Sequence, residues 1–348
     1  MSSNTAPVYL FGSYARDLYR ENNLQILALP DGLTRQYRYN KEWVPDSIWI
    51  EPESIQDSEA IVVSTFKNEE DEDYFDFHPI RKGKILSAEQ QNGMLIIIFE
   101  LLPEWADYSD EEYHENIKKL DYRPIDRENG YFISQDTSGK IAPTEIKWSG
   151  VEKWSKIIEK ISSKEETNEV FFYRVNGIKQ GEDTINLSGE RGNKRFNLLS
   201  GGNYSLEVIF RRGEMDKRTE VNAAGSHFRI QSRDGNFTIY PQETRLGFRS
   251  DRKLYDLTCD KVMSNKKDEI QMDINGIDGI HGASIKLPIV VNKRYRIHMM
   301  YIVLFFGIFL ATGLGQYWMT GDLGTLLPTS LGSVIVTILL WYIASYKR

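Results

Sequence analysis

The chain of 348 residues has a single cysteine, Cys259, and therefore cannot form an internal disulfide. It has no P-loop, no G-x-G-x-x-G or H-E-x-x-H motif and no cluster of cysteine and histidine, and its five histidines are scattered. The N-terminus lacks a basic region followed by a long apolar core, so no signal peptide is expected. These absences favour a reducing, cytoplasmic setting. They predict no cofactor and no metal site, and they give no support for an enzyme.

Long apolar runs are missing from residues 1–297 but occur twice afterwards, over 299–317 and 326–344. Each run is uncharged and long enough to cross a hydrocarbon core about 30 Å thick at about 1.5 Å per residue. Basic residues, which mark the cytoplasmic side of a membrane, flank the pair: Lys293, Arg294, Arg296, Lys347 and Arg348. The pattern predicts a two-helix transmembrane hairpin in a cell inner membrane, with both termini in the cytoplasm. A hairpin buried inside a soluble protein is the alternative.

Charge and composition divide the chain into four predicted segments. Residues 1–150 carry 28 acidic and 15 basic residues, whereas residues 151–297 carry 21 acidic and 26 basic residues. The first two predicted segments are an acidic β-rich cytoplasmic domain over 1–120 and a linker with an amphipathic helix over 121–168. They are followed by a basic membrane-proximal β-sandwich over 169–297 and by the transmembrane hairpin over 298–348. The fold class is therefore expected to be mainly β.

Two hairpin patterns support a β-rich N-terminal domain. Leu24, Ile26 and Ala28 recur with the two-residue period of a strand, Pro30-Asp31-Gly32 then makes a turn, and Arg35, Tyr37 and Tyr39 continue the period. A second hairpin is predicted to turn at Asn92-Gly93 and to return through the apolar run Leu95–Phe99, which predicts a strand buried on both faces. A small barrel and a sandwich fit this pattern equally well.

The second half reads as a helix followed by a sandwich. Ser149 and Glu152 fit a capping box, and the apolar residues that follow lie on one helical face. From residue 169 to residue 291, short apolar runs separated by glycine-containing turns are typical of a β-sandwich.

Three basic clusters fall between the predicted strands of this sandwich, and sandwich loops often form binding sites. Arginine pairs suit phosphate, and nearby phenylalanines (Phe196, Phe210, Phe228 and Phe248) would either stack on bases or point into the core. Attraction of the basic half to anionic lipid is the alternative explanation. The candidate ligand-binding residues are Arg191, Lys194, Arg195, Arg211, Arg212, Lys217, Arg218, Arg249 and Arg252.

The predicted hairpin has small residues at four-residue spacing, which allow helices to approach closely. Its candidate pore or helix-packing residues are Gly307, Ala311, Thr312, Gly315, Gln316, Ser333 and Thr337. Two helices cannot enclose a pore by themselves, so a channel would need four or more subunits.

With its polar head, its C-terminal hairpin and the basic loops around Arg211 and Arg212, the chain resembles in layout the membrane effectors of bacterial anti-phage defence. The resemblance implies an oligomeric ion channel or membrane-perturbing protein in antiviral defence, whose head senses a nucleotide or oligonucleotide and whose hairpin contacts membrane lipid. The alternative is a membrane-tethered adaptor whose acidic N-terminal domain recruits a protein partner without forming a pore.

Overall fold

The computed structural model describes residues 6–13, 17–67, 75–103, 131–135, 150–164, 167, 170–213, 225–275 and 282–293, together with positions 307, 311, 318 and 319. The chain divides into two compact units, Met1–Asn292 and Lys293–Arg348. Nearly all of the described residues belong to the first unit. They are mainly β, as predicted, and their strands form three sheets.

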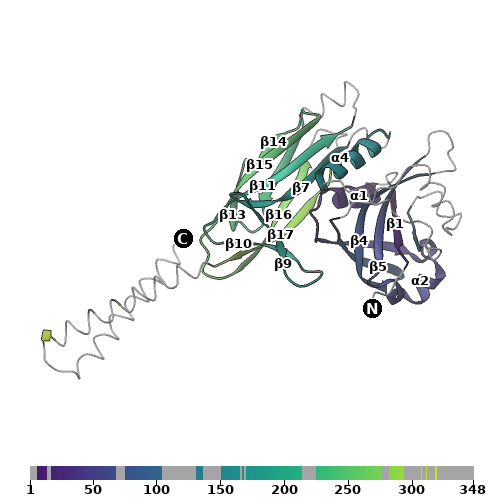
Figure 1. The fold of residues 1–348 in the computed structure, drawn as a ribbon, viewed down its shortest axis with the longest axis horizontal. Coiled ribbons are helices and arrows are strands. Elements are labelled where there is room, and N and C mark those ends of the chain that lie inside the picture. The colour runs from purple at the N-terminus through teal and green to yellow at the C-terminus, as the bar shows by residue number, and fades with distance from the viewer. Residues whose placement is uncertain are drawn as a thin grey trace. The chain divides into compact units, whose positions relative to one another are not determined.

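The N-terminal sheet is a mixed six-stranded sheet with the order β2-β5-β4-β3-β1-β6 (Figure 1). Strand β1 is parallel to β3, and the other pairs are antiparallel. The strands are β1 (Val8–Ser13), β2 (Thr34–Asn40), β3 (Glu59–Lys67), β4 (Phe75–Gln91), β5 (Met94–Leu101) and β6 (Ile133–Gln135). The expectation of a β-rich N-terminal domain is confirmed, but its described strands make one sheet that is open at β2 and β6.

The hairpin predicted at Asn92-Gly93 is confirmed, because β4 and β5 pair on either side of it. Both turn residues have positive φ, 52° at Asn92 and 77° at Gly93, which is the conformation that this dipeptide favours. Strand β5 alternates between buried and partly buried side chains, so the prediction of burial on both faces holds only in part.

The strand predicted over Leu24, Ile26 and Ala28 is wrong, because these residues belong to helix α1 (Asp17–Ala28). Leu24, Leu27 and Ala28 are all buried at the spacing of one helical face, and the carbonyl-rich end of the helix leads into the predicted turn. After β2 the chain forms three short helical segments: Lys41–Trp43, α2 (Asp46–Ile50) and Pro52–Ile55.

The predicted β-sandwich is supported by two further sheets. One has the order β14-β12-β16-β17-β10-β9 and the other β13-β15-β11-β7-β8. The strands are β7 (Phe171–Gln180), β8 (Asp183–Ile185), β9 (Leu187–Ser188), β10 (Arg195–Leu199), β11 (Asn203–Arg212), β12 (His227–Ser232), β13 (Phe237–Tyr240), β14 (Glu243–Arg245), β15 (Ser250–Cys259), β16 (Lys266–Asn275) and β17 (Ile285–Asn292). Aromatic side chains fill the space between the sheets, where Phe228 lies 4.9 Å from both Tyr173 and Phe210 between ring centroids.

The amphipathic helix predicted after Ser149 is α4 (Gly150–Ile161). Trp154, Ile157, Ile158 and Ile161 are buried, which confirms the predicted apolar face. Ser109 and Glu112 fit a capping box as well and predict a second helix over 110–120, which lies outside the described residues.

Within the described part of the chain, no helix is both long enough and apolar enough to cross a membrane. Gly307 and Ala311 are helical and exposed at their isolated positions. The other predicted hairpin residues, Thr312, Gly315, Gln316, Ser333 and Thr337, lie outside the described residues. The transmembrane hairpin therefore stays a prediction.

Candidate ligand-binding groove

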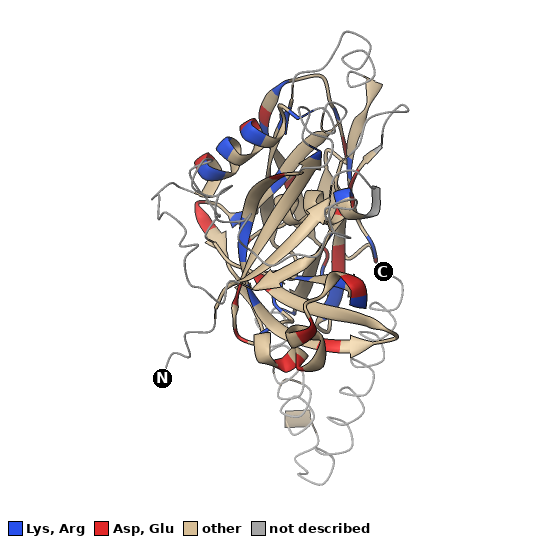
Figure 2. Ribbon diagram, turned by 90° about the vertical axis from the view of Figure 1, so that its right-hand side faces the viewer, with Lys and Arg blue, Asp and Glu red and all other residues tan. Residues whose placement is uncertain are grey.

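The predicted basic residues do not converge on one site. Arg191 pairs with Asp57 at 2.8 Å and Lys194 with Glu100 at 2.6 Å, so both reach toward the N-terminal sheet. Figure 2 shows Lys and Arg interspersed with Asp and Glu along the strands and along α4, and the ion pairs match this distribution. Lys217 and Arg218 lie outside the described residues.

The placement of these clusters in loops is also partly wrong. Arg195 begins β10, Arg211 and Arg212 end β11, and Arg252 lies in β15. Only Arg191, Lys194 and Arg249 of the described candidates lie between strands, and Arg249 O accepts a backbone bond of 3.0 Å from Arg212 N.

The strand residues are bonded to neighbours within the fold. Arg211 donates to Ser155 O at 2.6 Å and to Glu159 at 2.7 Å, both on α4. Arg252 lies 3.0 Å from the buried carboxylate of Glu207. Arg195 donates to Asn193 Oδ1. Part of the hydrogen-bonding capacity of these guanidinium groups is therefore already used within the protein.

The phenylalanines proposed as stacking groups belong to the core. Phe196, Phe210 and Phe228 are buried, and the partly buried Phe248 packs against the same cluster. The core interpretation of these residues is therefore the right one, since β-strand alternation points them between the sheets.

A groove of about 800 Å³ lies beside β2, a volume in the usual range for small-molecule sites. Its described lining combines aromatic, cationic, amide and apolar side chains: Tyr19, Trp43 and Tyr131; Arg35 and Arg38; Asn22, Gln36, Asn40 and Thr34; Met94 and Ile98; and Gly192. These described lining residues include two arginines and no carboxylate, so the wall favours an anion electrostatically.

Aromatic rings form one wall of the groove. Tyr19 from α1 stacks on Tyr131, with centroids 3.7 Å apart and planes 5° from parallel. Trp43 meets Tyr131 edge-on at 5.7 Å. Burial raises the pKa of the Tyr131 phenol, which stays protonated and donates to Arg38 O at 2.7 Å. Tyr39 also stacks on Tyr131, at 4.6 Å, and Tyr131 is buried, so the partly buried Tyr19 is the most accessible ring of this cluster for a planar ligand group.

Two buried donors in this lining have no hydrogen-bond partner among the described residues: Arg35 Nε and Trp43 Nε1. Trp43 is only 9% exposed, so water is largely excluded from it. Burial lowers the pKa of Arg35, and Tyr37 and then Glu21 oppose that shift, but a guanidinium remains charged at neutral pH. Unpaired buried donors are costly, and a hydrogen-bond acceptor that reached either atom would offset that cost.

The backbone of β2 adds further polar groups to the groove. Leu33 O accepts from Leu101 N at 2.8 Å, which places the odd-numbered residues of this segment against β5. The backbone groups of Thr34, Gln36 and Arg38 therefore face the opposite edge. Among the described strands, β2 pairs only with β5, and the hydroxyl of Tyr131 covers the Arg38 carbonyl.

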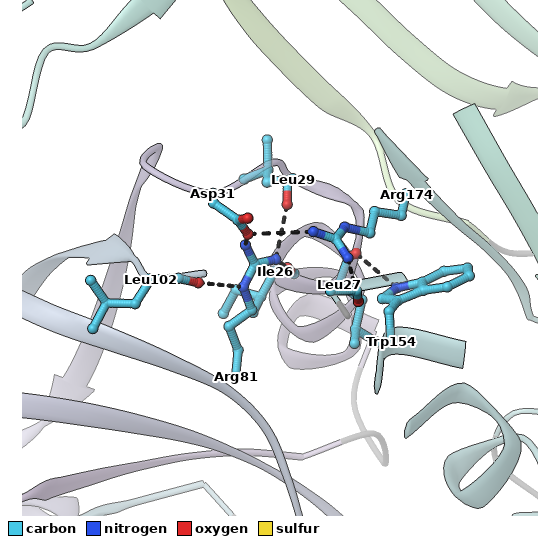
Figure 3. A network of polar contacts seen from close by, with 9 residues as sticks. Ile26, Leu27, Leu29, Asp31, Arg81, Leu102, Trp154 and Arg174 are labelled. Carbon is cyan, nitrogen blue, oxygen red and sulfur yellow. Dashed lines mark hydrogen bonds and ion pairs between the residues drawn. The ribbon is translucent and has the colours of Figure 1, made fainter. Parts of the chain in front are cut away.

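A buried polar network supports the far end of α1 (Figure 3). Arg81, with no exposed side-chain surface, donates to Ile26 O at 3.0 Å and Leu29 O at 2.9 Å and pairs with Asp31. Asp31 also lies 3.4 Å from Arg174 on β7. Burial lowers the pKa of Arg81 to about 9, which Asp31 opposes and Arg174 reinforces.

The same network attaches α4 to α1. Arg174 Nη1 donates to Gly150 O at 2.7 Å, and Trp154 Nε1 donates to Leu27 O at 3.1 Å. Carbonyls at the end of a helix lack partners within the helix, and here arginine and tryptophan supply donors to them. Helix α1 thus links the groove, through Tyr19 and Asn22, to the sandwich.

Reasoning from the sequence missed the groove because its residues are far apart in the chain. The missed aromatic residues are Tyr19, Trp43 and Tyr131, and the missed cations are Arg35 and Arg38. One local signal was present: from residue 34 to residue 40, polar residues alternate with Tyr37 and Tyr39, which marks a strand with one polar face.

No family model matches the chain, and no curated protein matches it. Among solved structures, a Bacteroides ovatus GH5 xyloglucanase in complex with a XXXG heptasaccharide is 6% identical, with a TM-score of 0.19, over 28% of this chain and 17% of that one. WR4, a C.elegans MSP family member, is 11% identical with a TM-score of 0.19, over 28% of this chain and 90% of that one. Similarity this low carries no functional argument.

Arg211→Glu is expected to lower the free energy of unfolding by about 1–2 kcal/mol, because it removes the bond to Ser155 O and places a carboxylate beside Glu159. Glu159 is largely exposed, so most of the loss should come from the Ser155 bond. Urea unfolding of the full chain measures it. Arg195→Glu is the matched control, since the Arg195 side chain donates to Asn193, two residues away, and to no other described residue. Equal losses in the two variants would contradict a role for Arg211 in holding α4.

Proposed function

We propose that the chain is a membrane-anchored effector whose head binds an anionic, nucleotide-type ligand in the groove beside β2. The observation that carries the proposal is the pair of unpartnered buried donors, Arg35 Nε and Trp43 Nε1, in a lining with two arginines and an aromatic wall. A phosphate suits the arginines and a base suits the aromatic surface. The amides of Asn22, Gln36 and Asn40 offer both donors and acceptors to a sugar or base.

The groove replaces the sandwich clusters as the preferred ligand site. The guanidiniums of Arg211 and Arg252 already have carboxylate partners, whereas Arg35 Nε has none among the described residues. Binding an anion at Arg35 would offset the cost of burying its charge. This function needs no catalytic group.

The direct test is to purify the full chain in detergent, determine its oligomeric state and identify the small molecules released on denaturation. We expect a homo-oligomer of four or more subunits that carries, or binds on addition, a nucleoside phosphate. A monomer that binds none of the nucleoside mono-, di- and triphosphates or cyclic dinucleotides would contradict the proposal.

In this proposal residues 298–348 anchor the head in the inner membrane and assemble the subunits, and ligand binding opens a pore or perturbs the bilayer, as in antiviral defence. The support is the uncharged character of both segments, their basic flanks and the four-residue spacing of Gly307, Ala311 and Gly315.

Ala311→Leu is expected to lower the oligomer population and to remove ion flux, since overpacking a tight contact costs about 1–3 kcal/mol and helix association in membranes is itself modest. Native mass spectrometry and liposome flux measurements report the two effects. Gly313→Leu, which enlarges a small residue outside the four-residue spacing, is the control and should assemble normally. Wild-type assembly of the Ala311→Leu protein would leave the hairpin as an anchor only.

A membrane-tethered adaptor is the second candidate, and the outer edge of β2, which no described strand covers, favours it. Backbone groups of Thr34 and Gln36 face that edge, where an extended peptide could pair as an added strand. An adaptor head should keep its activity when residues 298–348 are exchanged for an unrelated membrane anchor. An oligomeric effector should lose its activity in the same exchange.

A further inference from the structure

Gln25 on α1 bonds to two segments that are far apart in sequence. Its Oε1 accepts a hydrogen bond from Arg35 Nη2 in the groove, and its Nε2 donates to Ser284 O at 2.8 Å. The same Nε2 lies 2.9 Å from Glu21 Oε1, and Glu21 in turn accepts from Ser284 N at 3.4 Å. One side-chain amide therefore joins a groove arginine to the residue that precedes β17.

Ser284 occupies a defined position at the start of β17. The preceding Ala283 is buried, and its carbonyl accepts from Tyr173 Oη at 2.7 Å. Strand β17 runs from Ile285 to Asn292, and Lys293 is the first residue of the second compact unit. A change at Ser284 thus enters the strand that leads directly along the chain into the predicted hairpin.

An anion that binds Arg35 in the groove would compete with Gln25 for Arg35 Nη2. A phosphate or carboxylate binds guanidinium side-on through Nε and one Nη. Arg35 Nε has no partner among the described residues, and Arg35 Nη2 is bonded to Gln25. A bidentate anion would therefore share or take Nη2 and weaken the Arg35–Gln25 bond.

We infer that Gln25 is a positioning residue that orients Arg35 in the groove and transmits ligand binding there to the start of β17. The inference rests on the proposed function, because it takes the groove as the ligand site. The proposed coupling has two steps. Loss of the bond to Arg35 lets the Gln25 side chain move, which weakens its hydrogen bond to Ser284 O. The first residues of β17 then become more mobile. An effect of this kind is a coupling between two sites, and typical couplings are about 5- to 150-fold.

The test needs no ligand, so its outcome is independent of whether a nucleotide binds. Backbone hydrogen exchange at residues 284–287 is measured in the full chain for wild type, Arg35→Gln, Gln25→Leu and the double variant. We expect each single variant to speed exchange there by about 5-fold or more, and the double variant to add little, because both changes break one path. Exchange in β11 and β15 should stay at wild-type rates, which separates local loosening from general unfolding.

Two further variants sharpen the result. Arg38→Gln removes the other groove arginine and leaves the Gln25 side chain in place, so exchange at residues 284–287 should be unchanged. Gln25→Asn keeps the amide but is too short to reach both partners, so it should reproduce Gln25→Leu even if the leucine variant folds poorly. Unchanged exchange in Arg35→Gln, or effects of the two single variants that multiply in the double variant, would overturn the inference and leave the anion site itself untouched.

Discussion

Arg81→Ala is expected to cost about 3–5 kcal/mol in the free energy of unfolding, because it removes buried hydrogen bonds and leaves a cavity. Arg81 has no exposed side-chain surface and donates to the carbonyls of Ile26, Leu29 and Leu102. Its removal leaves those acceptors without this donor and leaves a cavity beside α1. Asp31, which is partly exposed, loses one of its two arginine partners and keeps Arg174.

Urea unfolding of the full chain in detergent, followed by the fluorescence of buried tryptophans such as Trp154, measures this loss. Arg81→Lys should lose less than Arg81→Ala, because lysine keeps the charge but offers a compact ammonium in place of a planar fork. Lys84 lies on the same strand as Arg81, and its exposed side chain pairs with Asp57. Lys84→Ala should therefore leave the urea midpoint of unfolding unchanged. An Arg81→Ala midpoint equal to that of Lys84→Ala would show that the network does not stabilise the junction of α1, β4 and β7.

Arg35→Gln is expected to weaken binding of a nucleoside phosphate to the head by about 10- to 100-fold, the effect of losing one or two charge-assisted hydrogen bonds. Trp43→Phe keeps a ring in the aromatic wall and deletes the unpartnered Nε1 donor, so a smaller loss of about 3- to 10-fold is expected. Titration calorimetry with the tightest-binding nucleotide of the panel gives both values.

The matched control is Arg252→Gln, which removes a sandwich arginine that already pairs with Glu207. It should bind the nucleotide as wild type does if the groove is the site. The reverse pattern, with Arg252→Gln weakened and Arg35→Gln unaffected, would return the ligand site to the sandwich. Wild-type binding by both variants would exclude both sites and favour the adaptor function.

Several elements were predictable because local chemistry decides them. The turn at Asn92-Gly93 needs positive φ at both residues, which these residue types adopt most readily. The α4 helix has its apolar residues on one face, and the short apolar runs after residue 169 appear as sandwich strands.

Helix α1 shows where local reading fails. Leu24, Ile26 and Ala28 satisfy a strand period, but Leu24, Leu27 and Ala28 satisfy a helical one equally well. The deciding contacts are distant: Arg81 on β4 and Trp154 on α4 donate to the carbonyls of α1. A short segment with two competing periods takes the form that its tertiary partners stabilise.

The sequence by itself determined the mainly β character, the sandwich strands, the charge asymmetry and the apolar segments near the C-terminus, because each follows from neighbouring residues. Only the tertiary structure decided which cations are already paired. Arg191 and Asp57 are 134 positions apart in the chain yet lie 2.8 Å apart in space. The groove is likewise assembled from α1, β2 and Tyr131. Electrostatic pairing and cavity shape depend on distance in space, which the order of residues along the chain does not specify.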